Sequence, residues 1–264
     1  MTVITLLTDF GLKDSYVAQM KGVILNIHPE AKLVDISHAV ERHNIAMGSF
    51  ILETTVPFFS DDTIHLAVVD PGVGSRRLPI VVECDRSVLV GPDNGLLARA
   101  SEKLGFRAAY QIQNGQFKGE VVSSTFHGRD IFAHTAGRIA AGYKPKEVGR
   151  KVSEIVELEL PKVAMSETGV TCSVLYIDTF GNIMTNVEED DLAQFGIRQR
   201  QPVKILTNSS EHKGRFVKSY SDVERGQVAV LWGSQGYLEI ARVEADAAHG
   251  LKVKPLDRIE LLFK

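Results

Sequence analysis

The chain has 264 residues, with 44% hydrophobic and 24% charged side chains and a formal net charge of −3. This composition is ordinary for a globular protein, and the length permits one large domain or two smaller ones. The slightly acidic balance excludes a protein that binds nucleic acid through bulk electrostatics. Because no apolar run approaches the roughly 18 residues that cross a membrane, we expect no membrane association and a cytoplasmic location.

Strands and helices alternate over the first part of the chain. Helical spacing of apolar residues predicts a first helix that Asp14 or Ser15 caps and that ends at His28-Pro29. It predicts another over 45–56 with Asn44 as its cap, and two more over 95–104 and 128–142. Apolar runs predict strands over 3–8, 32–36, 63–69, 79–84, 87–90 and 108–112. Nearly continuous apolar strands that alternate with helices indicate a covered, largely parallel sheet.

The pattern changes near Pro161. Only 188–195 looks helical beyond this point, and apolar runs predict strands over 169–178, 201–207, 226–232, 237–241 and 257–263. Such a series indicates a small barrel or sandwich. The predicted fold class is therefore α/β, with a Rossmann-like three-layer domain at 1–160 and a small all-β, barrel-like domain at 168–264. The two cysteines, Cys84 and Cys172, fit no metal or redox spacing, and we expect both to be buried in a protein of a reducing compartment.

A carboxylate, a tight turn and an arginine pair follow the strand over 63–69. Asp70 precedes Pro71 and Gly72, and Arg77 closes the segment. The turn lets backbone approach a ligand, and the opposite charges meet at a sheet edge. Three further segments have the same character: Thr8-Asp9-Phe10-Gly11, Gly91-Pro92-Asp93-Asn94-Gly95 and Phe126-His127-Gly128-Arg129-Asp130. Together they suggest an active site that is assembled from loops at strand ends.

Each of these side chains also has a structural interpretation. Asp9 could hold a vicinal diol such as a ribose, or a metal, or simply cap a turn. Asp-Pro-Gly is a common turn, although a carboxylate beside Arg77 is suited to orienting a donor. His127 lies at a predicted helix N-terminus, where free amides favour an anion, but a lone histidine is often structural. We expect Arg129 and Asp130 to anchor the loop.

The chain resembles the S-adenosyl-L-methionine hydrolases that form adenosine, also called hydroxide adenosyltransferases, which are relatives of fluorinase and chlorinase. The resemblance covers essentially the whole chain. Each motif is weak alone, and the combination is specific. It consists of the segments quoted above together with Asp14-Ser15, Asp178-Thr179-Phe180-Gly181-Asn182 and Gly236-Tyr237-Leu238.

The resemblance implies a role for each matching residue. Asp70, Arg77 and His127 match the set that positions and activates water, and Asp9 matches the carboxylate that holds the ribose hydroxyls. Asp178 and Ser234 match the residues that hold the amine and carboxylate of the methionine moiety. Asn182 and the backbone near Val243 match the adenine contacts. It also implies a homotrimer that binds S-adenosyl-L-methionine between the first domain of one subunit and the second domain of its neighbour. No metal and no cofactor are implied.

The chain departs from the halogenating relatives at four positions. It has Asp70, Val73, His127 and Gly128 where their halide pocket would supply Tyr, Thr and Ser. A carboxylate repels a halide, so the resemblance implies hydrolysis and disfavours halide transfer. The sequence does not decide whether His127 or Asp70 accepts the proton from water.

Two other functions remain open at this point. One is a metal-dependent hydrolase with Asp9, Asp70, His127 and Asp130 as ligands, although no familiar metal-binding spacing is present. The other is a non-catalytic protein that binds an adenosyl ligand and returns it unchanged.

Overall fold

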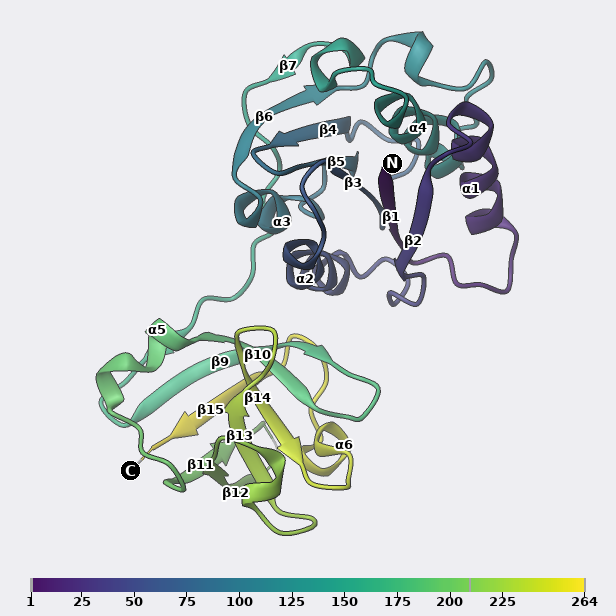
Figure 1. Ribbon diagram of the computed structural model, residues 1–264. Helices are drawn as coiled ribbons and strands as arrows, with labels where there is room; N and C mark the ends of the chain where they lie inside the picture. The colour runs from purple at the N-terminus through teal and green to yellow at the C-terminus, as the bar shows by residue number, and fades with distance from the viewer. Residues whose placement is uncertain (1, 209, 264) are drawn as a thin grey trace. The chain divides into compact units, whose positions relative to one another are not determined.

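A computed structural model describes residues 2–208 and 210–263. The chain divides into two compact units, Met1–Glu159 and Leu160–Lys264, called here the N-terminal and C-terminal units (Figure 1). The first contains a sheet covered by helices, and the second is a closed barrel. The predicted fold class is confirmed.

The sheet of the N-terminal unit has the strand order β2-β1-β3-β5-β4-β6-β7. Five strands run in one direction, because β2, β1, β3 and β5 pair in parallel and β4 is antiparallel to both β5 and β6. The remaining strand, β7, is antiparallel to β6. The bounds are β1 Val3–Thr8, β2 Lys32–Ser37, β3 Thr63–Val68, β4 Pro79–Cys84, β5 Ser87–Pro92, β6 Phe106–Gln111 and β7 Lys151–Val152.

Helices cover both faces of this sheet (Figure 1). On one face α1 (Tyr16–Ile27) packs against α4 (His134–Ala140) and the π-helical segment Gly128–Ala133 that precedes it. On the other face α2 (Ile45–Thr55) packs against α3 (Ala98–Lys103). These layers are the three that the sequence predicts.

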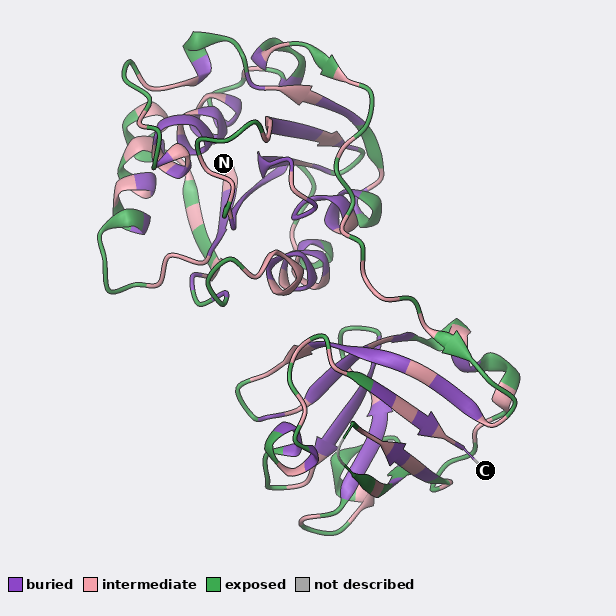
Figure 2. Ribbon diagram, turned by 180° about the vertical axis from the view of Figure 1, so that it is seen from behind, coloured by how far each residue is buried: buried purple, intermediate pink, exposed green. Residues whose placement is uncertain are grey.

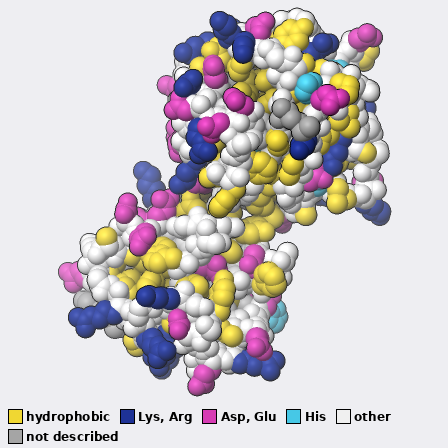
Figure 3. All heavy atoms as spheres, viewed as in Figure 1, with side chains coloured by type: hydrophobic (Ala, Val, Ile, Leu, Met, Phe, Trp, Pro, Cys, Tyr) yellow, Lys and Arg dark blue, Asp and Glu magenta, His cyan; other side chains and the backbone are white. Residues whose placement is uncertain are grey.

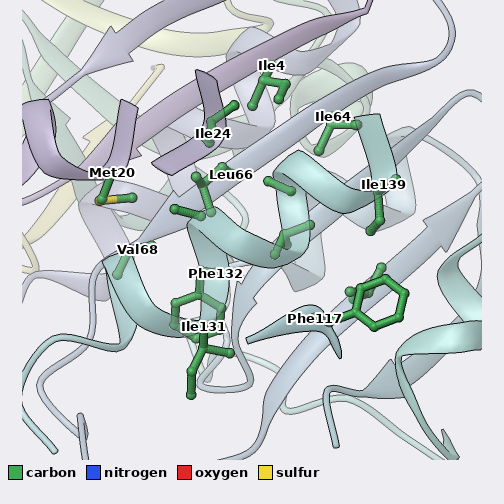
Figure 4. Packing of buried hydrophobic residues seen from close by; sticks show 14 of the residues in the cluster. Ile4, Met20, Ile24, Ile64, Leu66, Val68, Phe117, Ile131, Phe132 and Ile139 are labelled. Atoms are coloured by element: carbon green, nitrogen blue, oxygen red, sulfur yellow. The ribbon is translucent and has the colours of Figure 1, made fainter. Parts of the chain in front are cut away.

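Alternation along β1 supplies both cores, because successive side chains of a strand point to opposite faces. Ile4 packs with Met20, Ile24 and Phe132 under α1 and α4 (Figure 4). Leu6 belongs to the same cluster. Leu7 belongs to the opposite cluster, under α2 and α3. The cysteine in this unit, Cys84, is buried in that second cluster, and its burial raises the pKa of the thiol to about 12.

Two of the four predicted helices agree with the structure in their bounds, and two differ. The first helix begins at Tyr16 with Ser15 in the N-cap position, as predicted, although the Ser15 side chain makes no capping hydrogen bond. Asn44 caps α2 by accepting from the Met47 N–H, also as predicted. The helix predicted over 95–104 starts only at Ala98, because Gly95 has a φ of 95° and continues the preceding turn. The helix predicted over 128–142 opens as a π-helix and ends at Ala140.

The C-terminal unit closes into a seven-stranded barrel. Its sheet runs β10-β14-β13-β12-β11-β15-β9, and pairing of β10 with β9 joins the two ends, while β8 adds to β9 outside the ring. The interior is apolar and includes the buried Cys172 (buried residues are purple in Figure 2). The bounds are β8 Ala164–Met165, β9 Gly169–Ile177, β10 Ile183–Glu188, β11 Pro202–Leu206, β12 Glu211–Phe216, β13 Val228–Trp232, β14 Tyr237–Arg242 and β15 Arg258–Leu262.

Four elements of this unit escape prediction from the sequence, and one of them is the two-residue strand β8. Strand β12 has only one large apolar side chain, Phe216, so its pattern lacks the alternation that marks a strand. Strand β10 follows directly after the turn Asp178–Asn182, and the turn residues obscure the start of its strand pattern in the sequence. The helix α6 (Ala247–Leu251), capped by Asp246, corrects the expectation that only 188–195 is helical; that segment forms α5 (Glu189–Leu192) and a 3₁₀ turn.

None of the helices among the described residues is both long enough and apolar enough to span a bilayer. On the face shown in Figure 3, Lys and Arg side chains are interspersed with Asp and Glu side chains.

Candidate active site

The loop after β3 carries a buried ion pair. Arg77 Nε donates to Asp70 Oδ1 at 2.9 Å and to Oδ2 at 3.1 Å, and Arg77 Nη2 also donates to Oδ2. Both side chains are almost inaccessible, at 5% exposed for Asp70 and 9% for Arg77. A two-point contact of this kind fixes both groups in orientation as well as in position.

His127 joins this pair from a distant part of the sequence. Arg77 Nη2 lies 2.9 Å from His127 Nδ1. A guanidinium can only donate, so Nδ1 accepts, and the neutral ring carries its proton on Nε2. Burial and the adjacent Arg77 charge lower the pKa of His127, and the Asp70 and Asp130 carboxylates act in the opposite direction. The histidine is therefore neutral at pH 7, with an N–H rather than a lone pair at Nε2.

Neighbouring segments hold the two loops in place. Gly74 has a φ of 74°, and a Cβ there would lie 2.6 Å from the carbonyl oxygen of Ser124, so this close approach of the loops requires glycine. Asn94 Nδ2 donates to the Val69 carbonyl at 2.9 Å, directly before Asp70. Asn94 thus holds the backbone of the residue that precedes Asp70 in place.

Arg129 and Asp130 anchor the His127 loop, as expected. Arg129 Nε donates to Asp130 Oδ1 at 2.6 Å, and Asp130 Oδ2 accepts from the Ser123 N–H at 2.9 Å. These contacts tie the start of the π-helical segment to the chain before it. Short π-helical segments occur frequently at functional sites.

Asp70 and His127 line a cavity of about 190 Å³, called here the Asp70 cavity. Three aromatic rings, from Phe10, Tyr16 and Phe126, form much of its wall, with centroids 5.1–5.9 Å apart. The complete lining is Phe10, Tyr16, Val68, Asp70, Val73, Thr125, Phe126, His127 and Gly128. The rings are not among the residues predicted from the sequence, although Phe10 and Phe126 are adjacent to Asp9 and His127 in the motifs.

The four positions at which the resemblance implies a departure from the halogenating relatives converge on the Asp70 cavity. Asp70, Val73, His127 and Gly128 all contribute to its wall. A Cβ at position 128 would lie 3.2–3.3 Å from the side chains of Phe10, Met20 and Phe126. The glycine therefore leaves room for the rings to close round the cavity.

Asp9 lies outside the lining of this cavity. Its Oδ2 accepts from the backbone N–H of His43 at 2.9 Å, which ties the end of β1 to the segment before α2. Its predicted ribose contact stays a prediction. The other residue of this strand end, Phe10, does reach the cavity.

The C-terminal unit brings together the other predicted contacts. Asp178, Asn182, Ser234 and Val243 all line a cavity of about 780 Å³, called here the Asp178 cavity. Further lining comes from Phe180, Met184, Tyr220, Gln235, Glu239, Ala241, Arg242, Glu244, Ala245 and Asp246. Four residues that span 65 positions of sequence thus share one site.

Asp178 organises the turn between β9 and β10. Its Oδ1 accepts from the N–H groups of Phe180 and Asn182, each at 2.9 Å, and its Oδ2 accepts from Asn182 Nδ2 at 3.1 Å. Gly181 has a φ of 82°, and a Cβ there would lie 2.4 Å from the Asp246 side chain. The motif is therefore a rigid turn that presents Asn182 to the cavity.

A second carboxyl in this cavity has no counterpart among the residues predicted from the sequence. Glu239, on β14, is only 4% exposed, and Tyr220 donates a hydrogen bond of 2.5 Å to its Oε1. Burial raises the pKa of Glu239, as does the nearby Asp178 charge, and the bond from Tyr220 opposes the shift. Only its place after Gly236-Tyr237-Leu238 could have drawn attention to it.

The side chains proposed above for a metal site do not form one cluster. Asp9 binds the His43 backbone, Asp130 pairs with Arg129, and Asp70 pairs with Arg77. Among the described residues, no group of three or more His, Cys, Asp or Glu side chains is arranged to hold a metal ion.

Comparison with known proteins gives consistent matches along the chain. Residues 4–149 match the N-terminal domain and residues 172–260 the C-terminal domain of the SAM hydroxide adenosyltransferases. An (R)-S-adenosyl-L-methionine hydrolase of Methanocaldococcus jannaschii is 38% identical, over 100% of this chain and 97% of the relative. One from Salinispora tropica is 36% identical, over 98% and 97%.

More distant relatives and a solved structure agree with these matches. A fluorinase from an Actinoplanes species is 27% identical over 96% of this chain and 94% of the relative. The crystal structure of a conserved protein from Thermotoga maritima superposes with a TM-score of 0.94 at 36% identity, over 98% of this chain and 99% of that chain.

Proposed function

The chain belongs to the SAM hydroxide adenosyltransferase family, and on that premise we propose that it hydrolyses S-adenosyl-L-methionine to adenosine and L-methionine. The observation that carries the proposal is the hydrogen-bonded set of Asp70, Arg77 and His127, of which Asp70 and His127 line a small, largely apolar cavity. Two relatives of more than 35% identity are named for the (R) sulfonium epimer, so we extend the proposal to that epimer.

In the proposed reaction a water molecule attacks the ribose 5′ carbon in line with the departing sulfur. The new C–O bond forms as the C–S bond breaks, and the electron pair of that bond neutralises the sulfonium. Charge is lost in the transition state, so a cavity walled by Phe10, Tyr16 and Phe126 favours it. The ring faces also attract the sulfonium cation of the bound substrate.

Two side chains orient the water in this proposal. His127 donates from Nε2 to the water oxygen, because its Nδ1 is engaged by Arg77. Asp70 accepts a hydrogen bond from the same water and takes its proton as the C–O bond forms. Arg77 fixes the orientation of both side chains through its hydrogen bonds. Positioning of this kind lowers an activation free energy by up to about 7–11 kcal/mol.

Binding of the substrate uses both units in this proposal. Asp178 and Ser234 hold the methionine moiety and Asn182 and the Val243 backbone hold adenine, which agrees with their common place round the Asp178 cavity. Asp9 holds the ribose hydroxyls.

We also propose that the protein is a homotrimer in which a neighbouring subunit completes each site. Sedimentation equilibrium tests the oligomeric state, and a monomer at micromolar concentration would contradict the proposal.

We propose that no metal ion or other cofactor takes part, because Asp70, Arg77 and His127 supply the orienting groups themselves. Dialysis against a chelator is expected to leave turnover unchanged. Loss of turnover in the chelator, with recovery on adding a divalent metal, would instead support the metal-dependent hydrolase.

The deciding experiment incubates the protein with (R)- and (S)-S-adenosyl-L-methionine in ¹⁸O-labelled water. We expect adenosine and methionine in equal amounts, faster from the (R) epimer, with the label in the adenosine 5′ hydroxyl. Unlabelled adenosine would exclude water as the nucleophile, and unchanged substrate would identify a binding protein. Added chloride is expected to give no 5′-chloro product, because Asp70 and His127 occupy the halide positions.

A further inference from the structure

Glu239 is a buried carboxyl on the outer face of the barrel. Its strand neighbours Leu238 and Ile240 belong to the apolar interior, so Glu239 points to the opposite side, where it lines the Asp178 cavity. Burial of a carboxyl is costly unless a partner compensates it. The 4% exposure of this side chain therefore calls for a partner.

One oxygen of Glu239 has a protein partner and the other does not. Tyr220 donates to Oε1 at 2.5 Å, and Oε2 accepts no hydrogen bond from any residue that the structure describes. The Oε2 atom lies beside the turn that carries Ser234: a Cβ on Gly233 would be 2.9 Å from it. The glycine thus leaves space for this oxygen at the Ser234 turn.

The charges round the cavity leave this oxygen without a cation. Acidic side chains in the lining are Asp178, Glu239, Glu244 and Asp246, against a single Arg242 whose Nε donates to the Gly226 carbonyl. Both oxygens of Asp178 already accept hydrogen bonds within its own turn. The raised pKa of Glu239, caused first by burial and then by Asp178, agrees with a carboxyl that has no protein cation beside it.

We propose that Glu239, held by Tyr220, is a further substrate-binding residue whose Oε2 accepts a hydrogen bond from the α-ammonium of the methionine moiety. The inference rests on the proposed function. An ammonium carries three donors and a positive charge, so one carboxylate does not satisfy it. Glu239 and the Asp178–Ser234 contacts together supply acceptors on one side of the same cavity.

The test compares Glu239→Gln with Glu167→Gln, a change at an exposed carboxyl of the same unit that lies outside the lining of the Asp178 cavity. Glutamine keeps the shape and still accepts from Tyr220. We expect Glu239→Gln to raise the KM for S-adenosyl-L-methionine about 10–100-fold and to change kcat less than threefold. Glu167→Gln is expected to change either constant less than threefold.

A substrate analogue without the α-amino group separates binding from structure. We expect the wild type and Glu239→Gln to bind this analogue with equal affinity in calorimetry, because the group that Glu239 contacts is missing. An equal loss of affinity for substrate and analogue, or an unchanged affinity for the substrate, would overturn the inference. Matching thermal unfolding midpoints confirm that the variant folds.

The same experiments separate this inference from the proposed function. If the wild type binds S-adenosyl-L-methionine but forms no adenosine, the proposed hydrolysis fails, while the affinity difference between wild type and Glu239→Gln still tests the ammonium contact. If the wild type forms adenosine and Glu239→Gln keeps its affinity, the inference about Glu239 fails alone.

Discussion

The two cavities treat charge in opposite ways. In the Asp70 cavity the carboxylate and the guanidinium neutralise one another within the protein, and each fixes the direction of the other. In the Asp178 cavity the buried Glu239 has a hydroxyl partner and no cation. Charges that are compensated internally stay fixed whether or not a ligand is bound, whereas uncompensated ones attract a ligand. Changes in the first cavity should therefore lower kcat, and changes in the second should raise KM.

The largest expected effect is that of Arg77→Ala. Removing the guanidinium releases both Asp70 and His127, so we expect kcat to fall at least about 100-fold while KM changes less than threefold. Steady-state kinetics measure both constants. Arg76→Ala, which removes the exposed arginine next to it, is the matched control and should leave kcat unchanged. If Arg77→Ala changes KM more than kcat, the assignment of kcat effects to the Asp70 cavity is wrong.

Two substitutions at His127 test whether its Nε2 acts as a hydrogen-bond donor or as a general base. We expect His127→Ala to lower kcat about 100-fold and His127→Gln only about 10-fold, because the glutamine amide also presents an N–H near the Nε2 position. Equal losses in the two variants would favour a base at Nε2 instead.

The pH profile of kcat adds a second check on His127. Since the pKa of His127 is lowered below its usual 6.5, the active neutral form persists at pH 7 and is lost only as the pH falls below 6.5. The wild type should therefore show an acidic limb in kcat, and His127→Gln should flatten it.

A smaller effect is expected in the second cavity from Asp178→Asn. The asparagine oxygen can keep the bonds from Phe180 and Asn182, while the charge and the bond from Asn182 Nδ2 are lost. We expect KM to rise about 10-fold with kcat nearly unchanged. A fall in kcat without a change in KM would show that the two cavities do not divide their roles in this way.

The smallest effect concerns stability in acid. Burial lowers the pKa of His65, in the N-terminal unit, to about 4, against 6.5 for the exposed side chain. Below pH 6.5 His65 is protonated in the unfolded chain but stays neutral in the folded chain. The contribution of neutral His65 to the free energy of unfolding is therefore fully present above pH 6.5 and declines as the pH falls toward 4. Between pH 7 and pH 5.5 the loss should be about 1 kcal/mol.

Hydrogen exchange followed by mass spectrometry can assign this loss to one unit. The described histidines of the C-terminal unit, His212 and His249, are not buried, so protection should decline first in the N-terminal unit. His65→Gln should reduce the pH dependence there. Simultaneous loss in both units would contradict the assignment to His65.

The sequence by itself determined the order of most elements and one half of the site. Apolar runs predict β1, β3 and β4 because burial on both faces of a sheet demands continuous apolar residues. Asp70 and Arg77 are seven residues apart on one turn, so their pairing follows from local structure. The motifs also suffice to identify the family, which the comparisons confirm.

Only the tertiary structure decided the rest. His127 meets Arg77 across 50 residues of chain, and that contact fixes which ring nitrogen carries the proton. Glu239 becomes a buried acceptor because β14 pairs with β10 and Tyr220 donates a hydrogen bond to its carboxyl. Strand β12, with its polar sequence, exists because its neighbours supply the ladder of hydrogen bonds. Each depends on residues that are distant in sequence, and local pattern carries no information about which distant residue arrives.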